Sequence, residues 1–242
     1  MRREDEDVID GTLLSETPWP AEWSAERVVA ALEPLALPQR RARLERVARG
    51  RIGGVTVLFD APHDPHNGSA VLRSCDAFGV PELHVVPRAE SFLVGKRIAK
   101  GTQRWVDVVV HPTPEQAAAA LHGRGFVLAA AHPEGELLPE DLAGLRRVAI
   151  VLGNEHDGLC EALAGVSDRT VRIPMRGMVE SLNVSVAAAV LLAAATRGRE
   201  GDLGPAERTR YYARGLFHSV PRAGEVLRAL AAEAQRTAGF RT

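Results

Sequence analysis

Residues 55–86 have the sequence VTVLFDAPHDPHNGSAVLRSCDAFGVPELHVV. The first six, VTVLFD (55–60), are mostly apolar and β-branched, which is the length and composition of a buried strand. A helical stretch, NGSAVLRSCDAFG (67–79), follows and ends at a glycine, and LHVV (83–86) is a second short apolar run. Because parallel strands need a long crossover connection, this strand, helix and strand together predict a parallel sheet.

The same alternation continues toward the C-terminus. Three further helical stretches are expected in PEQAAAALHGRG (114–125), DLAGLR (141–146) and LCEALAG (159–165). A last apolar helix, SLNVSVAAAVLLAAATRGR (181–199), is predicted to be capped by Ser181. We therefore expect an α/β fold with a parallel sheet and helices on both of its faces. The remaining strands are predicted in VDVVV (106–110), FVLAAA (126–131), VAIVLG (148–153) and TVRIP (170–174).

The composition excludes several classes of protein. Of 242 residues, 45% are hydrophobic and 25% charged, which is typical of a soluble globular chain of one or two domains. No apolar run reaches the ~18 to 20 residues that span a bilayer, and the acidic N-terminus lacks the apolar core of a secretory signal. We therefore expect a cytoplasmic protein. Cys75 and Cys160 have no CxxC partner and no HExxH is present, so neither a disulfide framework nor a metal site is expected.

Charge is strongly segregated along the chain, although the formal net charge is only -1. Residues 1–38 carry a net charge of −6 and contain several prolines, so we expect an irregular or partly helical extension. Residues 39–51 carry +5, residues 52–196 carry −4, and the remainder from 197 to 242 carries +4. The two basic segments can present a local field to a polyanion.

The first basic segment, LPQRRARLERVARGR (37–51), has the pattern of an amphipathic helix. One interpretation is a solvated helix face, and the other is a surface that binds RNA phosphates. The arginines that would make those contacts are Arg40, Arg41, Arg46 and Arg49.

Polar residues follow three of the predicted strands. In open parallel α/β sheets, ligands bind beyond the carboxyl ends of the strands. Taken singly, Asn67 and Ser181 have residue types that favour N-caps, Gly153 suits a plain turn, and Arg73 could pair with Asp76 on its own helix. Their recurrence at three strand ends favours a binding site. The candidates are Asn67 and Arg73 after the first strand, Gly153 and Glu155 in VLGNEHDG (151–158), and Ser181 and Asn183 in IPMRGMVESLNVS (173–185).

The familiar nucleotide-binding signals are missing from the sequence. No GxGxxG follows the first strand and no GxxxxGK[ST] occurs, so dinucleotide and P-loop sites lack their phosphate cradle. A GxSxG nucleophile elbow is absent as well. The site must therefore hold its ligand in another way.

Three segments of this chain closely resemble the motifs of the SPOUT superfamily, specifically the SpoU/TrmH-type RNA ribose 2′-O-methyltransferases. They are HNGSAVLRSCDAFGV (66–80), VLGNEHDGL (151–159) and IPMRGMVESLNVSVAAAVLL (173–192). The resemblance implies S-adenosylmethionine as cofactor, a homodimer, and RNA as substrate, with guanosine 18 of tRNA as the expected target. It also implies a C-terminal deep trefoil knot, an exception to the rule that chains are unknotted. The implied organisation is an acidic extension (1–38), a basic helix (39–54), a methyltransferase domain (55–198) with its knot at about 150–198, and a basic helical extension (199–242).

The family's site residues carry over by position. The resemblance implies cofactor contacts at Ala131, Gly153, Ile173 and Leu182, although Ala131 replaces the more usual threonine and lacks its hydroxyl. It also implies that Arg73 accepts the proton of the ribose hydroxyl. Because a guanidinium keeps its proton in proteins, binding the adjacent phosphate and stabilising developing alkoxide charge is the chemically easier role. The implied catalytic set is Asn67, Arg73, Glu155, Ser181 and Asn183.

Two alternatives stay open at this point. A ribosomal-RNA methyltransferase of the same superfamily usually carries a separate substrate-binding domain ahead of the catalytic one. Residues 1–54 are too short and too polar for such a core, which favours tRNA. A non-catalytic RNA-binding protein on the same scaffold is the other alternative, because fold alone does not deliver function.

Overall fold

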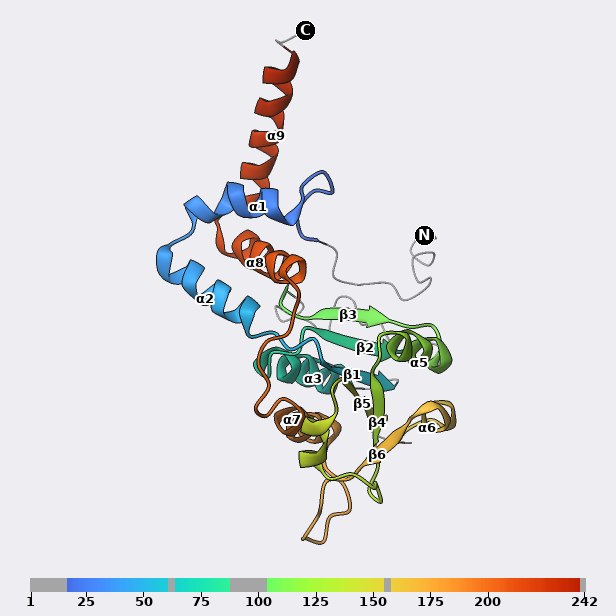
Figure 1. Cartoon of the computed structure of the whole chain (residues 1–242). Coiled ribbons are helices and arrows are strands. Elements are labelled where there is room, and N and C mark those ends of the chain that lie inside the picture. The colour runs from blue at the N-terminus through green and yellow to red at the C-terminus, as the bar shows by residue number, and fades with distance from the viewer. Residues whose placement is uncertain (1–16, 61–63, 88–103, 155–157, 240–242) are drawn as a thin grey trace. The chain divides into compact units, whose positions relative to one another are not determined.

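The structure is a computed structural model of the whole chain, and it describes residues 17–60, 64–87, 104–154 and 158–239 (Figure 1). The chain divides into two compact units. Among the described residues, one unit holds residues 51–202, and the other joins residues 17–50 to residues 203–239. Within these residues, no helix has both the length and the apolar character to cross a bilayer.

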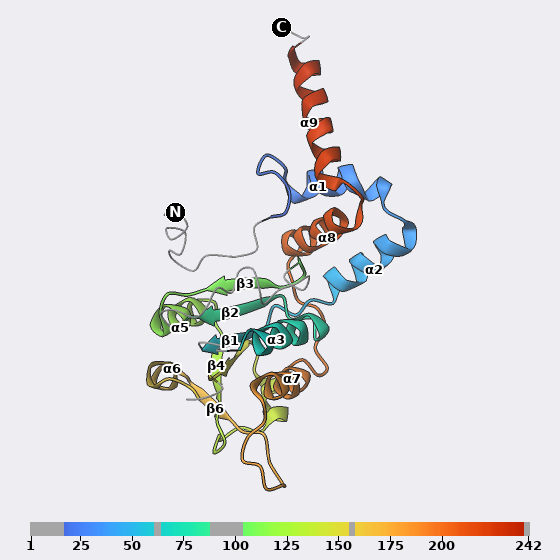
Figure 2. The same ribbon diagram turned by 180° about the vertical axis from the view of Figure 1, so that it is seen from behind.

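The first unit is built on a six-stranded sheet in the order β3-β2-β1-β5-β4-β6, and every neighbouring pair is parallel (Figures 1 and 2). All six predicted strands are present. The last is shorter than predicted, because after Val171 the chain pairs with Leu137 rather than with its neighbouring strand. The strands are β1 (Val55–Asp60), β2 (Glu82–Val86), β3 (Asp107–Val110), β4 (Val127–Ala131), β5 (Val148–Leu152) and β6 (Arg169–Val171).

Helices cover both faces of the sheet, as predicted. On one face α3 (Pro65–Ala77) packs against α7 (Val184–Ala195), over a core that includes Val57 and Phe59 of β1. On the other face α5 (Pro114–Gly123) packs against α6 (Glu161–Val166), and Leu58 belongs to that core. This division follows from the pleat, which sends alternate side chains of a strand to opposite faces.

Two predicted helices differ in detail. The last helix of the sheet unit begins at Val184 and is capped by Asn183, so the prediction that Ser181 caps it is wrong. Asn183 is the cap because its side-chain oxygen accepts a hydrogen bond from the N–H of Ser185. Where DLAGLR predicts a helix, the chain forms a six-residue 3-10 helix, η3 (Pro139–Gly144). Short segments of this kind often adopt the tighter 3-10 geometry, here with the Leu145 N–H bonded to the Leu142 carbonyl.

The second unit is helical and joins residues 17–50 to residues 203–239. Its helices α1 and α2 both pack on α8. Leu44 of α2 lies so close to Gly215 of α8 that a Cβ atom there would be 2.6 Å from a Leu44 methyl group. The hydroxyl of Tyr212 donates a hydrogen bond of 2.6 Å to Glu33. The elements are α1 (Ala25–Leu32), η1 (Glu33–Leu35), α2 (Pro38–Arg49), α8 (Pro205–Ser219) and α9 (Ala223–Gly239).

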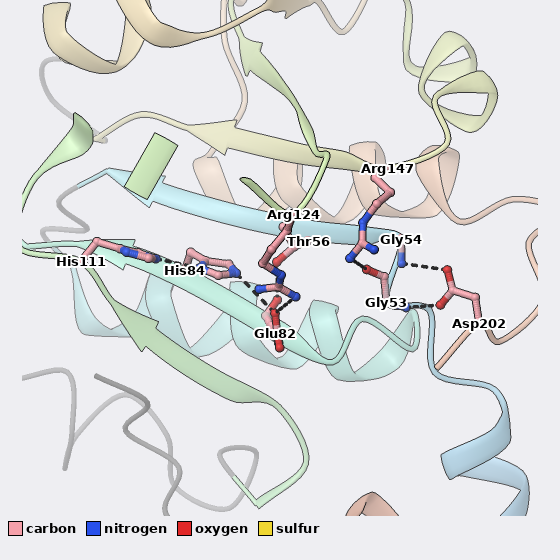
Figure 3. A network of polar contacts seen from close by, with 9 residues as sticks. All are labelled: Gly53, Gly54, Thr56, Glu82, His84, His111, Arg124, Arg147 and Asp202. Atoms are coloured by element: carbon pink, nitrogen blue, oxygen red, sulfur yellow. Dashed lines mark hydrogen bonds and ion pairs between the residues drawn. The ribbon is translucent and has the colours of Figure 1, made fainter. Parts of the chain in front are cut away.

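A network of buried polar side chains lies on β2 and next to β3 (Figure 3). Nδ1 of His84 is 2.8 Å from Nε2 of His111, and the two rings are stacked. Glu82 forms an ion pair of 2.7 Å with Arg124, and Thr56 donates a hydrogen bond to the Glu82 carbonyl. Burial raises the pKa of Glu82, but the contact with His84 and the Arg124 charge outweigh it and hold the pKa at about 2. Burial, helped by the charges of His84 and Arg124, lowers the pKa of His111 to about 4.

Figure 3 also shows the hydrogen bonds that connect the segment before β1 to Asp202, the last residue of this unit. The carboxylate of Asp202 accepts hydrogen bonds from the backbone N–H groups of Gly53 and Gly54. Arg147 donates to the Gly53 carbonyl at 3.3 Å. These contacts fix where β1 begins, and they lie at the amino ends of the strands, opposite the carboxyl ends at which ligands bind in such sheets.

Candidate functional site

A pocket of about 540 Å³ opens beyond the carboxyl ends of β4, β5 and β6. The segments that follow these strands form its walls, together with the loop before α7 and the first turn of that helix. This is the edge of the sheet where the strand-end argument places a ligand. The pocket lining includes all four residues predicted to bind the cofactor, Ala131, Gly153, Ile173 and Leu182.

The walls are mostly apolar, with a few polar groups among them. Leu152, Val171 and Val184 contribute side chains to the apolar surface. The polar side chains that line the pocket are mainly uncharged, such as those of Ser181 and Asn183. An apolar cleft with a small number of placed polar groups is typical of sites for small organic ligands, which usually occupy ~300 to 1,000 Å³.

Gly153 stands where two segments of backbone approach closely. A Cβ atom on Gly153 would lie 2.4 Å from the carbonyl carbon of Gly158 and from the nitrogen of Leu159. Asn154 and Gly158 exchange two backbone hydrogen bonds, of 2.8 and 3.0 Å, which hold the chain in this position. Glycine is therefore required here by close contact, which goes beyond the plain turn that its residue type suggests.

A second close approach of backbone lies next to Val171, which lines the pocket. A Cβ atom on Gly135 would lie 2.4 Å from the carbonyl carbon of Val171. The N–H of His132 donates to the Val171 carbonyl at 2.9 Å, which holds the residue after β4 in the pocket wall. Sequence reasoning assigned no role to His132. His132 directly follows Ala131, the last residue of β4, so the rule that ligands bind beyond the carboxyl ends of parallel strands also applies to it.

The first and third polar segments meet beside the pocket. Nδ2 of Asn183 donates a hydrogen bond of 3.1 Å to Oδ1 of Asn67, which lies 116 residues earlier in the chain. Asn183 lines the pocket and caps α7, whereas Asn67 lies within α3. Asp64 caps that helix, so the cap that the residue type of Asn67 favours is not its role. Packing of α3 against α7 is what brings the two amides together.

One member of the predicted catalytic set lies apart from this pocket, and another falls outside the described residues. Arg73 is exposed on α3 and is not among the described residues that line the pocket. It does not pair with Asp76, which instead forms an ion pair of 2.6 Å with the buried Arg51. Glu155 lies outside the described residues. The structure therefore brings together Asn67, Ser181 and Asn183, and leaves Arg73 on the outer surface of the unit.

The four arginines predicted to bind RNA all lie on α2, in the helical unit. Arg46 and Arg49 are exposed, and Arg49 pairs with Glu45 one turn away at 2.6 Å. Arg40 and Arg41 are half-buried, and Nε of Arg40 donates to the Ser219 hydroxyl at 2.8 Å.

Metal ligands are not grouped anywhere in the part of the chain that the structure describes. No three His, Cys, Asp or Glu side chains of those residues lie close enough together to hold an ion. Among the described residues, the candidate site consists of the pocket and the asparagine pair beside it.

Together, the parallel sheet and the pocket beyond its carboxyl ends define an α/β protein with a site of the size that small organic ligands occupy. The sequence profile of the SpoU rRNA Methylase family matches residues 54–193, more than half of the chain. The chain belongs to this family, which confirms the resemblance seen in its three motifs.

Individual relatives agree with this assignment. The tRNA (guanosine(18)-2'-O)-methyltransferase of Thermus thermophilus is 42% identical over 166 residues, which cover 66% of this chain and 83% of that protein. The crystal structure of the A. aeolicus TrmH/SpoU tRNA modifying enzyme matches with a TM-score of 0.65 at 28% identity, covering 76% of this chain and 98% of that one. The SpoU methyltransferase AviRb from Streptomyces viridochromogenes, solved with AdoMet, matches with a TM-score of 0.53 at 29% identity, covering 62% of this chain and 58% of that one.

Proposed function

We propose that this protein transfers the methyl group of S-adenosylmethionine to the ribose 2′-hydroxyl of guanosine 18 in tRNA. The observation that carries the proposal is the hydrogen-bonded pair Asn183 and Asn67 at the rim of an apolar pocket. The relatives described above support the choice of RNA and of position, because the Thermus protein carries this activity in its name.

The pocket suits S-adenosylmethionine in size and chemistry. A volume of about 540 Å³, lined by apolar side chains and a few polar groups, fits an adenine ring and the sulfonium-bearing amino-acid chain. Ala131 has no side-chain hydroxyl, so any contact there uses its backbone or its methyl group. When bound, the cofactor supplies an electrophilic methyl group on a sulfonium. The residues that would hold it are Ala131, Gly153, Ile173 and Leu182.

Methyl transfer makes one oxygen–carbon bond as one carbon–sulfur bond breaks, and the hydroxyl proton must leave. In-line positioning and charge stabilisation therefore supply the catalysis. Arg73 stands outside the pocket on an exposed helix face, where an RNA backbone can reach it. In this proposal its guanidinium binds the adjacent phosphate and stabilises the developing alkoxide, and phosphate or water takes the proton. Asn67 orients the ribose, Ser181 and Asn183 shape the rim of the cofactor pocket, and Glu155 braces their loop.

The proposal extends to the knot and to the arrangement of the domains. Residues 55–198 are the methyltransferase domain, and about 150–198 form the deep trefoil knot of the family. Membership of the SpoU family supports this proposal, as does the close approach of the Gly158 and Leu159 backbone to Gly153. The acidic extension 1–38 and the basic segments 39–54 and 199–242 flank this domain. A tRNA substrate implies that the protein works in the cytoplasm.

A homodimer is proposed from the exposed face of α7. Val186, Val190 and Ala193 form an apolar stripe along this helix, and Met178 and Val179 in the preceding loop are 98% and 61% exposed. A contiguous apolar surface of this kind marks an interface. Light scattering at micromolar concentration should give the mass of a dimer, and Val190→Glu should shift it toward the monomer. A monomer mass for the unaltered protein would contradict the proposal.

We propose that Arg40, Arg41, Arg46 and Arg49 of α2 attract the tRNA. Replacing all four with Gln should weaken binding and reduce the slope of log affinity against log salt by ~0.7 to 0.9 for each phosphate that the variant no longer binds. Turnover at saturating tRNA should change little, because these arginines act equally on ground and transition states. A variant with only the exposed pair, Arg46→Gln and Arg49→Gln, keeps the hydrogen bond from Arg40 to Ser219 and serves as the control. An unaltered salt slope in both variants would mean that α2 is only a solvated face.

The proposed function is tested by mapping methylation on unmodified transcripts. Full-length protein is incubated with labelled S-adenosylmethionine and tRNA, and 2′-O-methyl groups are located by sequence. We expect one methyl group at guanosine 18, and none on a matched transcript that has deoxyguanosine there. Methylation of a ribosomal-RNA transcript alone would move the substrate to the second candidate. Cofactor and RNA binding without any transfer would support a non-catalytic RNA-binding protein.

A further inference from the structure

We infer that Ser185 is a positioning residue for methyl transfer, acting through Asn183 on Asn67. The inference rests on the proposed function, and it adds a residue that does not line the pocket itself. Ser185 is the second residue of α7 and is half-buried.

The side chain of Asn183 is held by two donors from one residue. Its Oδ1 accepts the backbone N–H of Ser185 at 2.9 Å and the Ser185 hydroxyl at 2.6 Å. A carboxamide oxygen has two lone pairs, and here both are used. A flipped carboxamide would turn its NH2 group toward the backbone N–H of Ser185, which can only donate. The orientation of the Asn183 amide is therefore fixed by its surroundings.

This orientation determines what Asn183 offers to α3. Because Oδ1 faces Ser185, the NH2 group must face Asn67, where it donates to Oδ1 at 3.1 Å. Oδ1 of Asn67 then accepts a hydrogen bond from Asn183, and the NH2 group of Asn67 is turned away from Asn183. Ser185 thus donates to Asn183, and Asn183 donates to Asn67. These hydrogen bonds join two segments of the proposed site.

The hydroxyl contributes more than a helix cap needs. An N-cap requires one hydrogen bond from the second or third backbone N–H, which Asn183 already receives. Without the hydroxyl, that cap would remain, but the carboxamide would have only one of the two bonds that stop it from rotating. A merely structural role for Ser185 would therefore affect the stability of the fold, whereas a positioning role would affect turnover.

The test compares Ser185→Ala, Ser185→Thr and a matched control in the full-length protein. Thr196→Ala is the control, because it removes a hydroxyl whose hydrogen bond, to the Leu192 carbonyl at 2.7 Å, lies at the opposite end of α7 and away from the asparagine pair. We expect Ser185→Ala to lower kcat on tRNA about tenfold, the worth of one neutral hydrogen bond, with KM for tRNA unchanged. Ser185→Thr, which keeps the hydroxyl, should restore kcat, and Thr196→Ala should leave it unaltered.

Two results would overturn the inference. One is a Ser185→Ala variant with unaltered kcat. The other is a loss of kcat that is accompanied by a proportionate fall in melting temperature and that Ser185→Thr does not rescue. In both cases the unaltered protein still methylates tRNA, so the proposed function stands. An unaltered protein that transfers no methyl group to any RNA would instead remove the proposed function, and the role of Ser185 with it.

Discussion

The pocket rim and the buried network on β2 and next to β3 use polar residues in opposite ways. At the rim, Ser181 and Asn183 are exposed and carry neutral hydroxyl and amide groups. In the network, His84 and His111 are only 2% and 4% exposed, and His111 and Glu82 have strongly shifted pKa values. Shifted pKa values usually indicate functional sites, yet here they lie away from the pocket. Methyl transfer needs positioned donors more than a tuned acid or base, which explains the difference.

The network has a structural explanation of its own. A carboxylate removed from water must be paired, and Glu82 is paired with Arg124 (Figure 3). Burial favours the neutral form of the His111 imidazole, and one ring proton is enough for its 2.8 Å contact with His84. The comparison therefore predicts that changes at the rim remove activity and that changes in the network alter stability.

The largest expected effect at the rim is that of Gly153→Ala. The added Cβ would lie 2.4 Å from backbone atoms of Gly158 and Leu159, and backbone cannot move aside as a flexible side chain does. We expect cofactor binding, measured by calorimetry, to fall below detection, together with methyl transfer. Gly165→Ala on α6 is the matched control, because a Cβ there meets nothing within 4 Å, and it should bind normally. Normal cofactor binding by Gly153→Ala would mean that this turn does not form the site.

A smaller but still large effect is expected for Arg73→Ala. Loss of one preorganised charge stabiliser costs ~10²- to 10³-fold in rate, and cofactor affinity should stay nearly unchanged because Arg73 does not line the pocket. Arg73→Lys should recover only part of the rate, since an ammonium lacks the planar fork that binds phosphate. Single-turnover kinetics with calorimetry separate the two quantities. Arg169→Ala, which removes a surface pair with Glu136, should leave the rate unaltered. Activity within a few-fold in Arg73→Ala would remove the residue from the catalytic set.

Much of this architecture could be predicted from the sequence, because strands buried on both faces leave continuous apolar runs. The run 55–60 coincides with β1 for this reason. The order β3-β2-β1-β5-β4-β6 could not be predicted in the same way, since it depends on contacts between distant segments. For the site, strand-end positions identified Gly153, Ser181 and Asn183, whereas Ala131, Ile173 and Leu182 were implied by the family resemblance. Choosing Asn183 over Ser181 as the cap, and pairing it with Asn67, required the packing of α3 on α7.

The smallest expected effect is a loss of folding stability in acid. It should come from titration of the buried network and not from groups that line the pocket. The pKa of His111 is lowered from 6.5 to about 4 by folding, so the unfolded chain binds its proton more readily than the folded protein. Stability should therefore fall as pH drops from about 6.5 to about 4, by up to about 3 kcal/mol. The pKa of Glu82 is lowered from 4.5 to about 2, so its contribution is present above pH 4.5 and is lost below, in a second window.

Urea unfolding between pH 7 and pH 4 measures the first of these windows, and His111→Gln is the variant that isolates it. Glutamine does not titrate in this range, so the variant should have a flatter pH dependence between pH 6.5 and 4. It also loses the ring stacked on His84, so its free energy of unfolding at pH 7 should be lower. Cofactor affinity at pH 7 should be the same in both proteins, because His111 does not line the pocket. If His111→Gln keeps the pH dependence of the unaltered protein, the titrating group lies elsewhere. If it weakens cofactor binding at pH 7, the network and the pocket are coupled, and the separation between a structural and a functional set of polar residues fails.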